Sequence, residues 1–334
     1  MSMYNKFFGL DKNPFNMTPD PAFLFLTAQH REALAGLWYA VLEKKGFLVL
    51  TGDAGTGKTT LVSKVLQNFP PELVRPILIL NPSLSPAEFL EMTLLDAGMQ
   101  KVPESKAQRL ASFHSILLEG HQAGTATALF VDEAHKLSLE LLEEIRLLGN
   151  FEYADEKLLQ ILLVGQDELN TLLERDDLRQ FKQRIALRIS IGRLSQAETG
   201  QYIEYRWTKA GGMSKPPFTP DAIASVYACS SGIPRVINVL CDNALMIAYG
   251  EGHESVTLAS VTSAARDLYL IGHGHPVPVI PAYRPVPVEK DSELLHLEPI
   301  HMKTLERYGS ESEQSSLLRR WAGKLGLFHR VTEV

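Results

Sequence analysis

The sequence predicts an α/β protein built on a five-stranded parallel sheet, followed by a smaller all-helical domain and a proline-rich tail. Four short apolar runs alternate with helical stretches in the first half of the chain, and a fifth run follows them. Strands that alternate with helices form parallel sheets covered on both faces. From Ser195 onward the apolar spacing fits helices only. We therefore expect one α/β domain and one helical domain.

The expected strands are the five apolar runs themselves. They lie at 46–52, 74–81, 127–135, 158–166 and 186–194. A helix is expected from Thr27, because apolar residues recur there at helical spacing between Leu34 and Leu42. Together with the N-terminal residues, these elements make up an expected nucleotide-binding domain over residues 1–194.

Four helices are expected over residues 195–270, and they define a helical lid domain over 195–271. The first begins with a Ser195-x-x-Glu198 capping pattern and ends before Gly211 and Gly212. Residues 272–334 form the tail, which has clustered prolines that favour an extended linker. Its end, 316–330, is a candidate amphipathic helix for a membrane surface or a partner groove. The simpler alternatives are packing on its own domain or disorder.

The net charge, the cysteines and the histidines limit the general class of the protein. The formal net charge is −6, so no global basic surplus indicates nucleic acid or an anionic membrane, although a local basic patch stays open. Cys229 and Cys241 lie in an apolar region, which favours buried free thiols in a reducing compartment. His273 and His275 indicate a metal only weakly, because no acidic or cysteine residues cluster nearby. No signal peptide or membrane span is recognisable, so we expect a cytoplasmic protein.

The stretch GDAGTGKT follows the first expected strand and precedes a helix. It matches the phosphate-loop pattern G-x-x-x-x-G-K-[ST] in full and in the right context. Backbone N–H groups of such a loop surround phosphates, Lys58 reaches the β- and γ-phosphates, and Thr59 ligates Mg²⁺. The expected ATP-binding residues here are Gly52, Asp53, Ala54, Gly55, Thr56, Gly57, Lys58, Thr59 and Thr60.

Acidic and polar residues end two further strands. Asp132 follows an apolar run, and we expect it to hold Mg²⁺ through water, with Glu133 as the general base. Gln166 ends the fourth run and can orient the attacking water or sense the γ-phosphate, although a simple turn residue is an equal alternative. His135 either contacts the site or is an exposed loop residue.

Two groups of arginines are candidates for reading the state of the nucleotide. Arg184, just before the fifth run, is the first choice for an arginine presented to a neighbouring subunit, and Arg179 is the second. Arg188 belongs to the same basic segment. The alternative is a basic helix end that complements the helix dipole. Arg235 begins a helix of the lid, where it can turn toward the nucleotide.

These motifs in combination resemble an AAA+ ATPase, and more narrowly the ExeA/GspA family, the general secretion pathway protein A ATPases. The opening FFGLDKNPFNMTPDPAFLFLTAQHREAL, the stretch LLQILLVGQDEL and the stretch RLSQAETGQYIEYR carry the resemblance, which covers residues 3 to about 270. That family is similar to the transposition ATPases TnsC and MuB and to initiator-type ATPases. The resemblance implies nucleotide-dependent oligomerisation, sensor roles for Gln166 and Arg235, and an adenine site near Pro14, Phe15 and His30.

The tail departs from that family, whose members continue into a membrane span and a peptidoglycan-binding domain. Neither is recognisable here, so cell-wall binding is not carried over. The expected function is that of a cytoplasmic ATPase, with ATP and Mg²⁺ as cofactors, which oligomerises with ATP and acts as an assembly or switch factor for a secretion or cell-envelope export system. It can be peripheral at the inner membrane. The alternatives are a DNA-binding regulator ATPase of the transposition or initiator type and a nucleotide switch with negligible hydrolysis.

Overall fold

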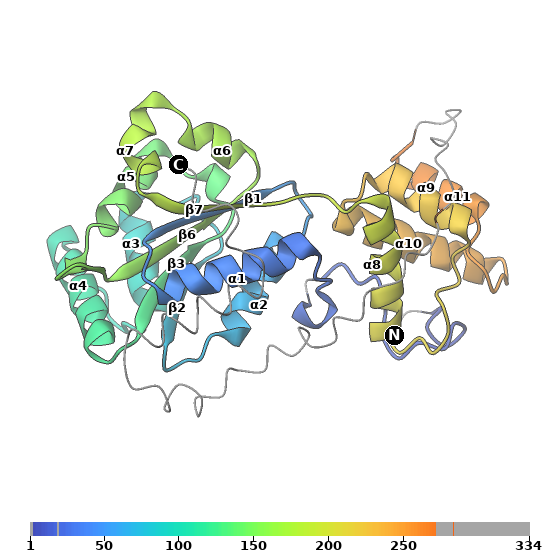
Figure 1. Cartoon of the computed structure of the whole chain (residues 1–334), viewed down its shortest axis with the longest axis horizontal. Coiled ribbons are helices and arrows are strands. Elements are labelled where there is room, and N and C mark those ends of the chain that lie inside the picture. Colours follow the sequence, from blue (N-terminus) through green and yellow to red (C-terminus); the bar gives the residue numbers. More distant parts are fainter. Residues whose placement is uncertain (1–2, 19, 272–282, 284–334) are drawn as a thin grey trace. The chain divides into compact units, whose positions relative to one another are not determined.

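The computed structural model describes residues 3–18, 20–271 and 283 (Figure 1). They divide into two compact units. The sheet unit comprises Ala28–Gly52 and Val62–Ile191. The helical unit comprises the residues up to Thr27, the segment Asp53–Leu61, and the described residues from Gly192 onward. The expected tail over 272–334, including the candidate helix at 316–330 and the histidines 273 and 275, lies outside the described residues except for Tyr283.

The sheet unit contains the five expected strands, all parallel, in the order β2-β3-β6-β1-β7. Their bounds are β1 Phe47–Gly52, β2 Val74–Ile79, β3 Ala126–Val131, β6 Leu159–Val164 and β7 Ile185–Ile191. A short antiparallel hairpin, β4 Glu152–Tyr153 with β5 Glu156–Lys157, was not expected. Strand β3 ends at Val131, so the acidic residues that follow it lie beyond its carboxyl end. The predicted α/β class with a five-stranded parallel sheet is confirmed.

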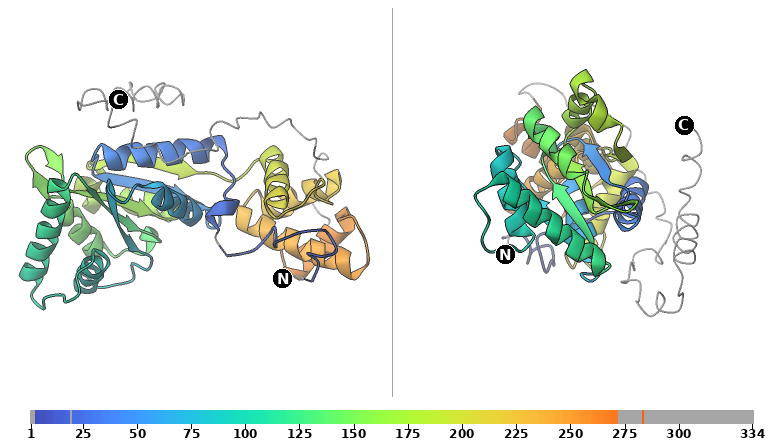
Figure 2. Two further views of the ribbon diagram at one scale, coloured as in Figure 1. Left: turned by 90° about the horizontal axis from the view of Figure 1, so that it is seen from below. Right: turned by 90° about the vertical axis from the view of Figure 1, so that its left-hand side faces the viewer.

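The central strands are buried on both sides, because helices cover both faces of the sheet. One face packs against α3 Pro86–Asp96, α4 Lys106–Gln122 and α5 Leu139–Leu148. The opposite face packs against α1 Ala28–Leu42 (Figure 2). On that face Trp38 stacks on Phe69, whose ring lies 6.5 Å from that of Phe130 on β3. Both layers are thus joined to the sheet by apolar contacts.

The remaining elements before β7 are the helix α2, which follows β1, and five short helices. They are η1 Pro21–Phe23, α2 Lys58–Asn68, η2 Ala134–Lys136, α6 Glu168–Leu173, η3 Asp176–Leu178 and α7 Arg179–Lys182. Helix α2 begins in the helical unit at Lys58 and continues in the sheet unit from Val62.

The helical unit contains the four expected helices. They are α8 Gln196–Lys209, α9 Pro220–Ser230, α10 Pro234–Gly250 and α11 Leu258–Asp267. The predicted capping box is present, because the Ser195 side chain accepts from the backbone of Glu198, whose carboxylate accepts from the Ser195 backbone. The start of α8 therefore lies where the sequence placed it.

The N-terminal segment packs into the helical unit, whereas the sequence grouped it with the nucleotide-binding domain. Tyr4 and Phe15 are fully buried in the core of this unit, and the Phe15 ring meets Phe218 edge-on at 6.1 Å. The Tyr4 hydroxyl donates to Asp242 on α10. Aromatic residues at the start of the chain thus complete the core of the lid helices.

Both cysteines are free, as expected: Cys241 is buried and Cys229 is half-buried. Burial among apolar side chains raises the pKa of the Cys241 thiol well above its usual value, which keeps it protonated and unreactive. Among the described residues, no helix is both long enough and apolar enough to span a membrane.

Candidate nucleotide-binding site

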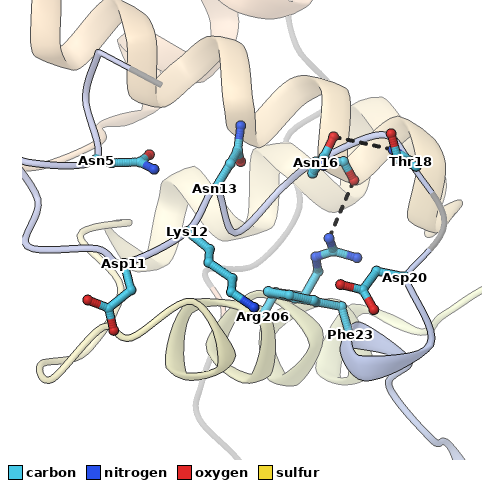
Figure 3. Close-up of a pocket in the computed structure, with 9 residues that line it drawn as sticks. All are labelled: Asn5, Asp11, Lys12, Asn13, Asn16, Thr18, Asp20, Phe23 and Arg206. Atoms are coloured by element: carbon cyan, nitrogen blue, oxygen red, sulfur yellow. Dashed lines mark hydrogen bonds between the residues drawn. The ribbon is translucent and has the colours of Figure 1, made fainter. Parts of the chain in front are cut away.

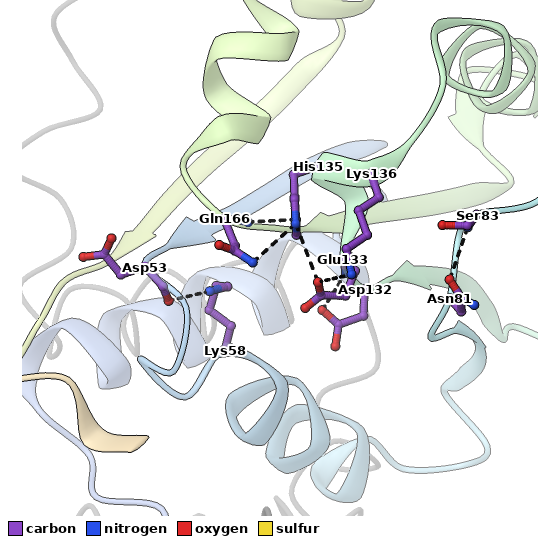
Figure 4. A network of polar contacts seen from close by, with 9 residues as sticks. All are labelled: Asp53, Lys58, Asn81, Ser83, Asp132, Glu133, His135, Lys136 and Gln166. Carbon is purple, nitrogen blue, oxygen red and sulfur yellow. Dashed lines mark hydrogen bonds and ion pairs between the residues drawn. The ribbon is translucent and has the colours of Figure 1, made fainter. Parts of the chain in front are cut away.

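The phosphate loop leaves the carboxyl end of β1 and leads into α2. Its Gly55 and Gly57 have φ values of 82° and 97°, in the left-handed region that glycine adopts without strain. The Asp53 carbonyl accepts hydrogen bonds from the Thr56 backbone at 3.3 Å, from the Thr56 hydroxyl at 2.9 Å and from Lys58 Nζ at 2.8 Å. The loop is therefore closed on itself, and the buried Lys58 is held at its centre (Figure 4).

The first turn of α10 lies directly against this loop within the helical unit. The backbone N–H of Arg235 donates to the Gly55 carbonyl at 3.2 Å. A Cβ placed on Gly55 would lie 2.8 Å from the Arg235 Cβ and 3.2 Å from the Ile233 Cγ2. Only glycine therefore permits this approach. This contact places the backbone of Arg235 against the phosphate loop, and the predicted turn of its side chain toward the nucleotide stays a prediction.

A second arginine contacts the loop from the segment before α8. Arg193 Nε lies 2.5 Å from the Asp53 carboxylate, and both side chains are partly exposed. The hydrogen bond from Arg193 holds the pKa of Asp53 below its usual value. The sequence offered no signal for this pair, because the two residues are 140 positions apart.

The acidic pair after β3 has a defined geometry. The Asp132 backbone N–H donates to the Ile79 carbonyl at 2.9 Å, which extends the pairing of β3 with β2 by one residue. The Asp132 carboxylate accepts from the Glu133 backbone at 2.8 Å. Glu133 itself has φ 53° and ψ 31°, a left-handed conformation that costs a residue with a side chain about 1–2 kcal/mol. Such local strain is typical of functional positions.

His135 connects the two predicted catalytic side chains of the sheet unit (Figure 4). Its Nδ1 accepts from the Gln166 backbone N–H at 3.3 Å. Its Nε2 lies 3.3 Å from the Gln166 side-chain amide and 3.6 Å from the Glu133 carboxylate. Nε2 of His135 therefore faces both Glu133 and Gln166. Of the two interpretations that the sequence left open, contact with the site is the one observed.

Glu133 also has a neighbouring cation in this structure. Its carboxylate lies 3.0 Å from Lys136 Nζ, three residues further along the chain. The Glu133 carboxylate thus lies close to Lys136 and His135, both from the turn that follows it.

The predicted finger arginines differ in their surroundings. The Arg184 guanidinium donates to the Arg146 carbonyl at 3.2 Å and to the Asn150 side chain, both near the end of α5. Arg179, the first residue of α7, is exposed, and so is Arg188 on β7. Arg184 is therefore engaged within its own sheet unit, while Arg179 faces solvent.

The three residues expected near adenine are all buried. Phe15 and Pro14 are buried in the helical unit, and the Pro14 carbonyl accepts from Arg206 Nε at 2.5 Å. His30 is buried on α1 of the sheet unit. A polar pocket of about 430 Å³ lies in the helical unit (Figure 3). It is lined by Asn5, Asp11, Lys12, Asn13, Asn16, Thr18, Asp20, Phe23 and Arg206.

The donor set fits a nucleotide with Mg²⁺. The phosphate loop supplies a buried lysine and a glycine cradle in which a Cβ would collide with α10. Thr59 supplies a hydroxyl in the first turn of α2, and Asp132 a carboxylate at the end of β3, both oxygen ligands that Mg²⁺ prefers. No cluster of three or more His, Cys, Asp or Glu that could bind a metal alone occurs in the described residues.

A phosphate loop after strand β1, an acidic pair after β3 and a helical lid define an AAA+ protein of the P-loop NTPase class. A family model described as "AAA domain" matches residues 41–173. Two solved structures share the fold. They are the Aeropyrum pernix ORC2 protein (TM-score 0.59, 16% identity, 77% of this chain and 71% of that chain) and the Aeropyrum pernix ORC1 protein in complex with DNA (TM-score 0.55, 19%, 77% and 69%).

Within that class, the chain is related to the general secretion pathway protein A family. It is 38% identical to General secretion pathway protein A of Aeromonas hydrophila over 270 residues, which is 80% of this chain and 48% of that protein. It thus spans about half the length of this relative. It is 27% identical over 241 residues to the Mu-like prophage FluMu DNA transposition protein B of Haemophilus influenzae, covering 66% of this chain and 76% of that protein. The predicted resemblance to both groups is confirmed.

Proposed function

We propose that the protein binds and hydrolyses ATP and uses the cycle to control its own oligomerisation. The observation that carries this proposal is the phosphate loop with Arg235 seated on Gly55, because a lid arginine in that place senses the bound phosphates. In this scheme Lys58 leaves the Asp53 carbonyl for the β- and γ-phosphates. Thr59 and, through water, Asp132 would hold Mg²⁺, which would supply charge neutralisation at the phosphates.

Glu133 acts as the general base on the attacking water. Its left-handed backbone and its contacts with His135 and Lys136 support this assignment, because they fix the direction of the carboxylate. Gln166 acts beside Glu133 as the residue that orients the water or senses the γ-phosphate. His135 holds the side chains of Gln166 and Glu133 in position. A positioned base of this kind contributes a factor of about 10²–10⁴ to the rate.

The oligomer completes the site with an arginine from a neighbouring copy. Between the two candidates, exposure favours Arg179, because the Arg184 guanidinium already bonds the Arg146 carbonyl and Asn150 of its own chain. Arginine fingers supplied by a neighbour raise the rate by about 10³–10⁵-fold. An isolated copy is therefore a slow ATPase, and turnover rises with assembly.

In the cell, we propose an assembly or switch factor of a secretion or cell-envelope export system, located in the cytoplasm. Support comes from the 38% identical relative, which is named General secretion pathway protein A. Peripheral contact with the inner membrane through 316–330 is part of the proposal and rests on sequence alone. The specific alternative is DNA binding, which the relative named DNA transposition protein B supports at 27% identity. The net charge of −6 favours the first assignment.

Two point variants with matched controls test the proposed chemistry. Lys58→Ala should abolish ATP binding, whereas Lys64→Ala, the same charge change in the same helix α2, should leave it intact. Glu133→Gln should bind ATP, stop hydrolysing it and accumulate as an oligomer, while Glu140→Gln on exposed α5 surface should behave as wild type. Fluorescent ATP binding, phosphate release and light scattering after gel filtration provide the measurements. A wild-type rate in Glu133→Gln would show that Glu133 is not the base.

Binding assays separate the two cellular roles. Wild type with ATP is titrated with double-stranded DNA and, separately, with anionic vesicles at several salt concentrations. The secretion assignment predicts no tight DNA binding. Tight, salt-sensitive DNA binding would instead establish the DNA-binding alternative, because phosphate contacts release counterions.

A further inference from the structure

Gly200 stands in the middle of α8, where glycine is an unfavourable residue. The structure gives a reason for its presence. A Cβ on Gly200 would lie 2.2 Å from the Cζ of Tyr283, 2.3 Å from its Cε2 and 2.7 Å from its hydroxyl oxygen. No side chain can occupy position 200 while the Tyr283 ring is there. The Tyr283 ring thus occupies the space that a Cβ at position 200 would fill.

Tyr283 is the described residue of the tail that makes this contact. Tyr283 is 5% exposed and belongs to the core of the helical unit. Its backbone N–H donates to the carbonyl of Pro220, the first residue of α9, at 3.2 Å. Its hydroxyl is buried and has no hydrogen-bond partner among the described residues. Burial and the nearby charge of Glu204 on α8 raise the pKa of Tyr283, so the ring is a neutral phenol.

We propose that α8 and α9 form a docking site for one aromatic residue of a proline-flanked segment, and that Tyr283 of the same chain occupies it. The site is the surface of Gly200 together with the Pro220 carbonyl, and we call it the aromatic socket. The segment is suited to it, because Pro281 and Pro285 restrict the backbone on either side of the tyrosine and lower the entropy lost on docking.

The Tyr283 hydroxyl, which has no hydrogen-bond partner among the described residues, indicates which part of the side chain the socket recognises. A buried hydroxyl without a partner is a cost to binding, so the ring and the backbone hydrogen bond provide the affinity. Phenylalanine at position 283 should therefore dock at least as well as tyrosine. Docking attaches the tail to the unit that holds the phosphate loop, so a partner that binds the tail is linked to that unit.

Protection from chymotrypsin tests the docking in the full chain. In wild type the bond after Tyr283 should be cleaved at least about ten times more slowly than the bond after Tyr269, whose side chain is 86% exposed. Gly200→Ala should remove this protection. Gly250→Ala, a helical glycine of the same unit with nothing within 4 Å of its added Cβ, should retain it. Equal cleavage at both tyrosines in wild type would overturn the proposal.

A peptide competition tests recognition directly. A labelled peptide of residues 278–288 should bind the full-length Tyr283→Ala protein and not wild type, in which the socket is filled. Replacing tyrosine by phenylalanine in the peptide should preserve binding, and replacing it by alanine should abolish it. Binding should also be lost in Gly200→Ala/Tyr283→Ala. Equal binding of the peptide to Tyr283→Ala and to this double variant would contradict the aromatic socket.

Two controls cover misfolding and exchange between copies. Gly200→Ala/Tyr283→Ala should melt at or above the temperature of Tyr283→Ala, because alanine favours a helix once the ring is absent. A lower melting temperature would overturn the claim that the ring explains Gly200. Protection of Tyr283 should not change when the protein is diluted. Protection lost on dilution would mean that the tail of a second copy fills the socket, and the assignment to the same chain would be wrong.

Discussion

Gly55→Ala is the perturbation for which the structure provides the most detailed expectation. Two costs add at this position. With φ at 82°, a residue with a Cβ pays about 1–2 kcal/mol for the left-handed conformation. The new Cβ would also lie 2.8 Å from the Arg235 Cβ, and such overpacking typically costs about 1–3 kcal/mol. The sum is about 2–5 kcal/mol.

Gly252→Ala is the matched control for the first of these costs. Gly252 belongs to the same unit and has φ 70°, but nothing lies within 4 Å of its added Cβ. It should therefore pay about 1–2 kcal/mol only. In thermal unfolding followed by circular dichroism, Gly55→Ala should lower Tm by about 4–20 °C and Gly252→Ala by about 2–8 °C.

The same pair of variants distinguishes a local effect on the nucleotide site. In Gly55→Ala the start of α10 must move away from the phosphate loop and take Arg235 with it, so ATP affinity should fall by about tenfold or more. Gly252→Ala should bind ATP as wild type does. If Gly55→Ala and Gly252→Ala lost the same stability and the same affinity, the contact between Arg235 and the loop would be refuted.

Three further predictions concern the other contacts of the site. His135→Ala should lower kcat for ATP hydrolysis by about 10²-fold or less with little change in ATP affinity, since in the proposed mechanism His135 positions Glu133 and Gln166 without touching phosphate. An unchanged kcat in phosphate-release assays would show that His135 has no role in the mechanism. Arg179→Ala should abolish the rise of turnover with protein concentration, and Arg184→Ala should mainly lower Tm; the reverse pattern would make Arg184 the finger. The pKa of Asp53 is depressed in the folded protein, so its ion pair with Arg193 stabilises the fold at neutral pH, and this stability is lost as pH falls through the folded pKa. The Tm difference between wild type and Arg193→Ala should therefore shrink in acid. A Tm difference that stays constant with pH would argue against the Arg193–Asp53 pair.

Much of the fold follows from local pattern. The five strands are continuous apolar runs because they are buried on both faces, and that signal does not depend on distant residues. The start of α8 was also predictable from neighbouring residues, since Ser195 and Glu198 form a capping box within one turn. The phosphate loop and Asp132 are likewise contiguous motifs, each following its own strand.

The parts that sequence did not predict depend on contacts between distant positions. The N-terminal aromatics carry no mark that they belong to the helical unit, because any apolar surface would accept them. The sequence left His135 as either a residue that contacts the site or an exposed loop residue, and its contact with Gln166 after β6 is a finding of the structure. Gly200 lies within α8, and the Tyr283 ring that occupies the space beside it comes 83 positions later in the sequence. Arg193 and Asp53 are equally remote in sequence.

The central claim is that this site hydrolyses ATP with Glu133 as the base, and one measurement tests it most directly. ATP binding and phosphate release are measured on the same preparations of wild type and Glu133→Gln, at a protein concentration where wild type assembles. We predict that both bind ATP with similar affinity and that Glu133→Gln releases phosphate at least about 10²-fold more slowly. Equal release by the two proteins, or no release by assembled wild type, would contradict the claim.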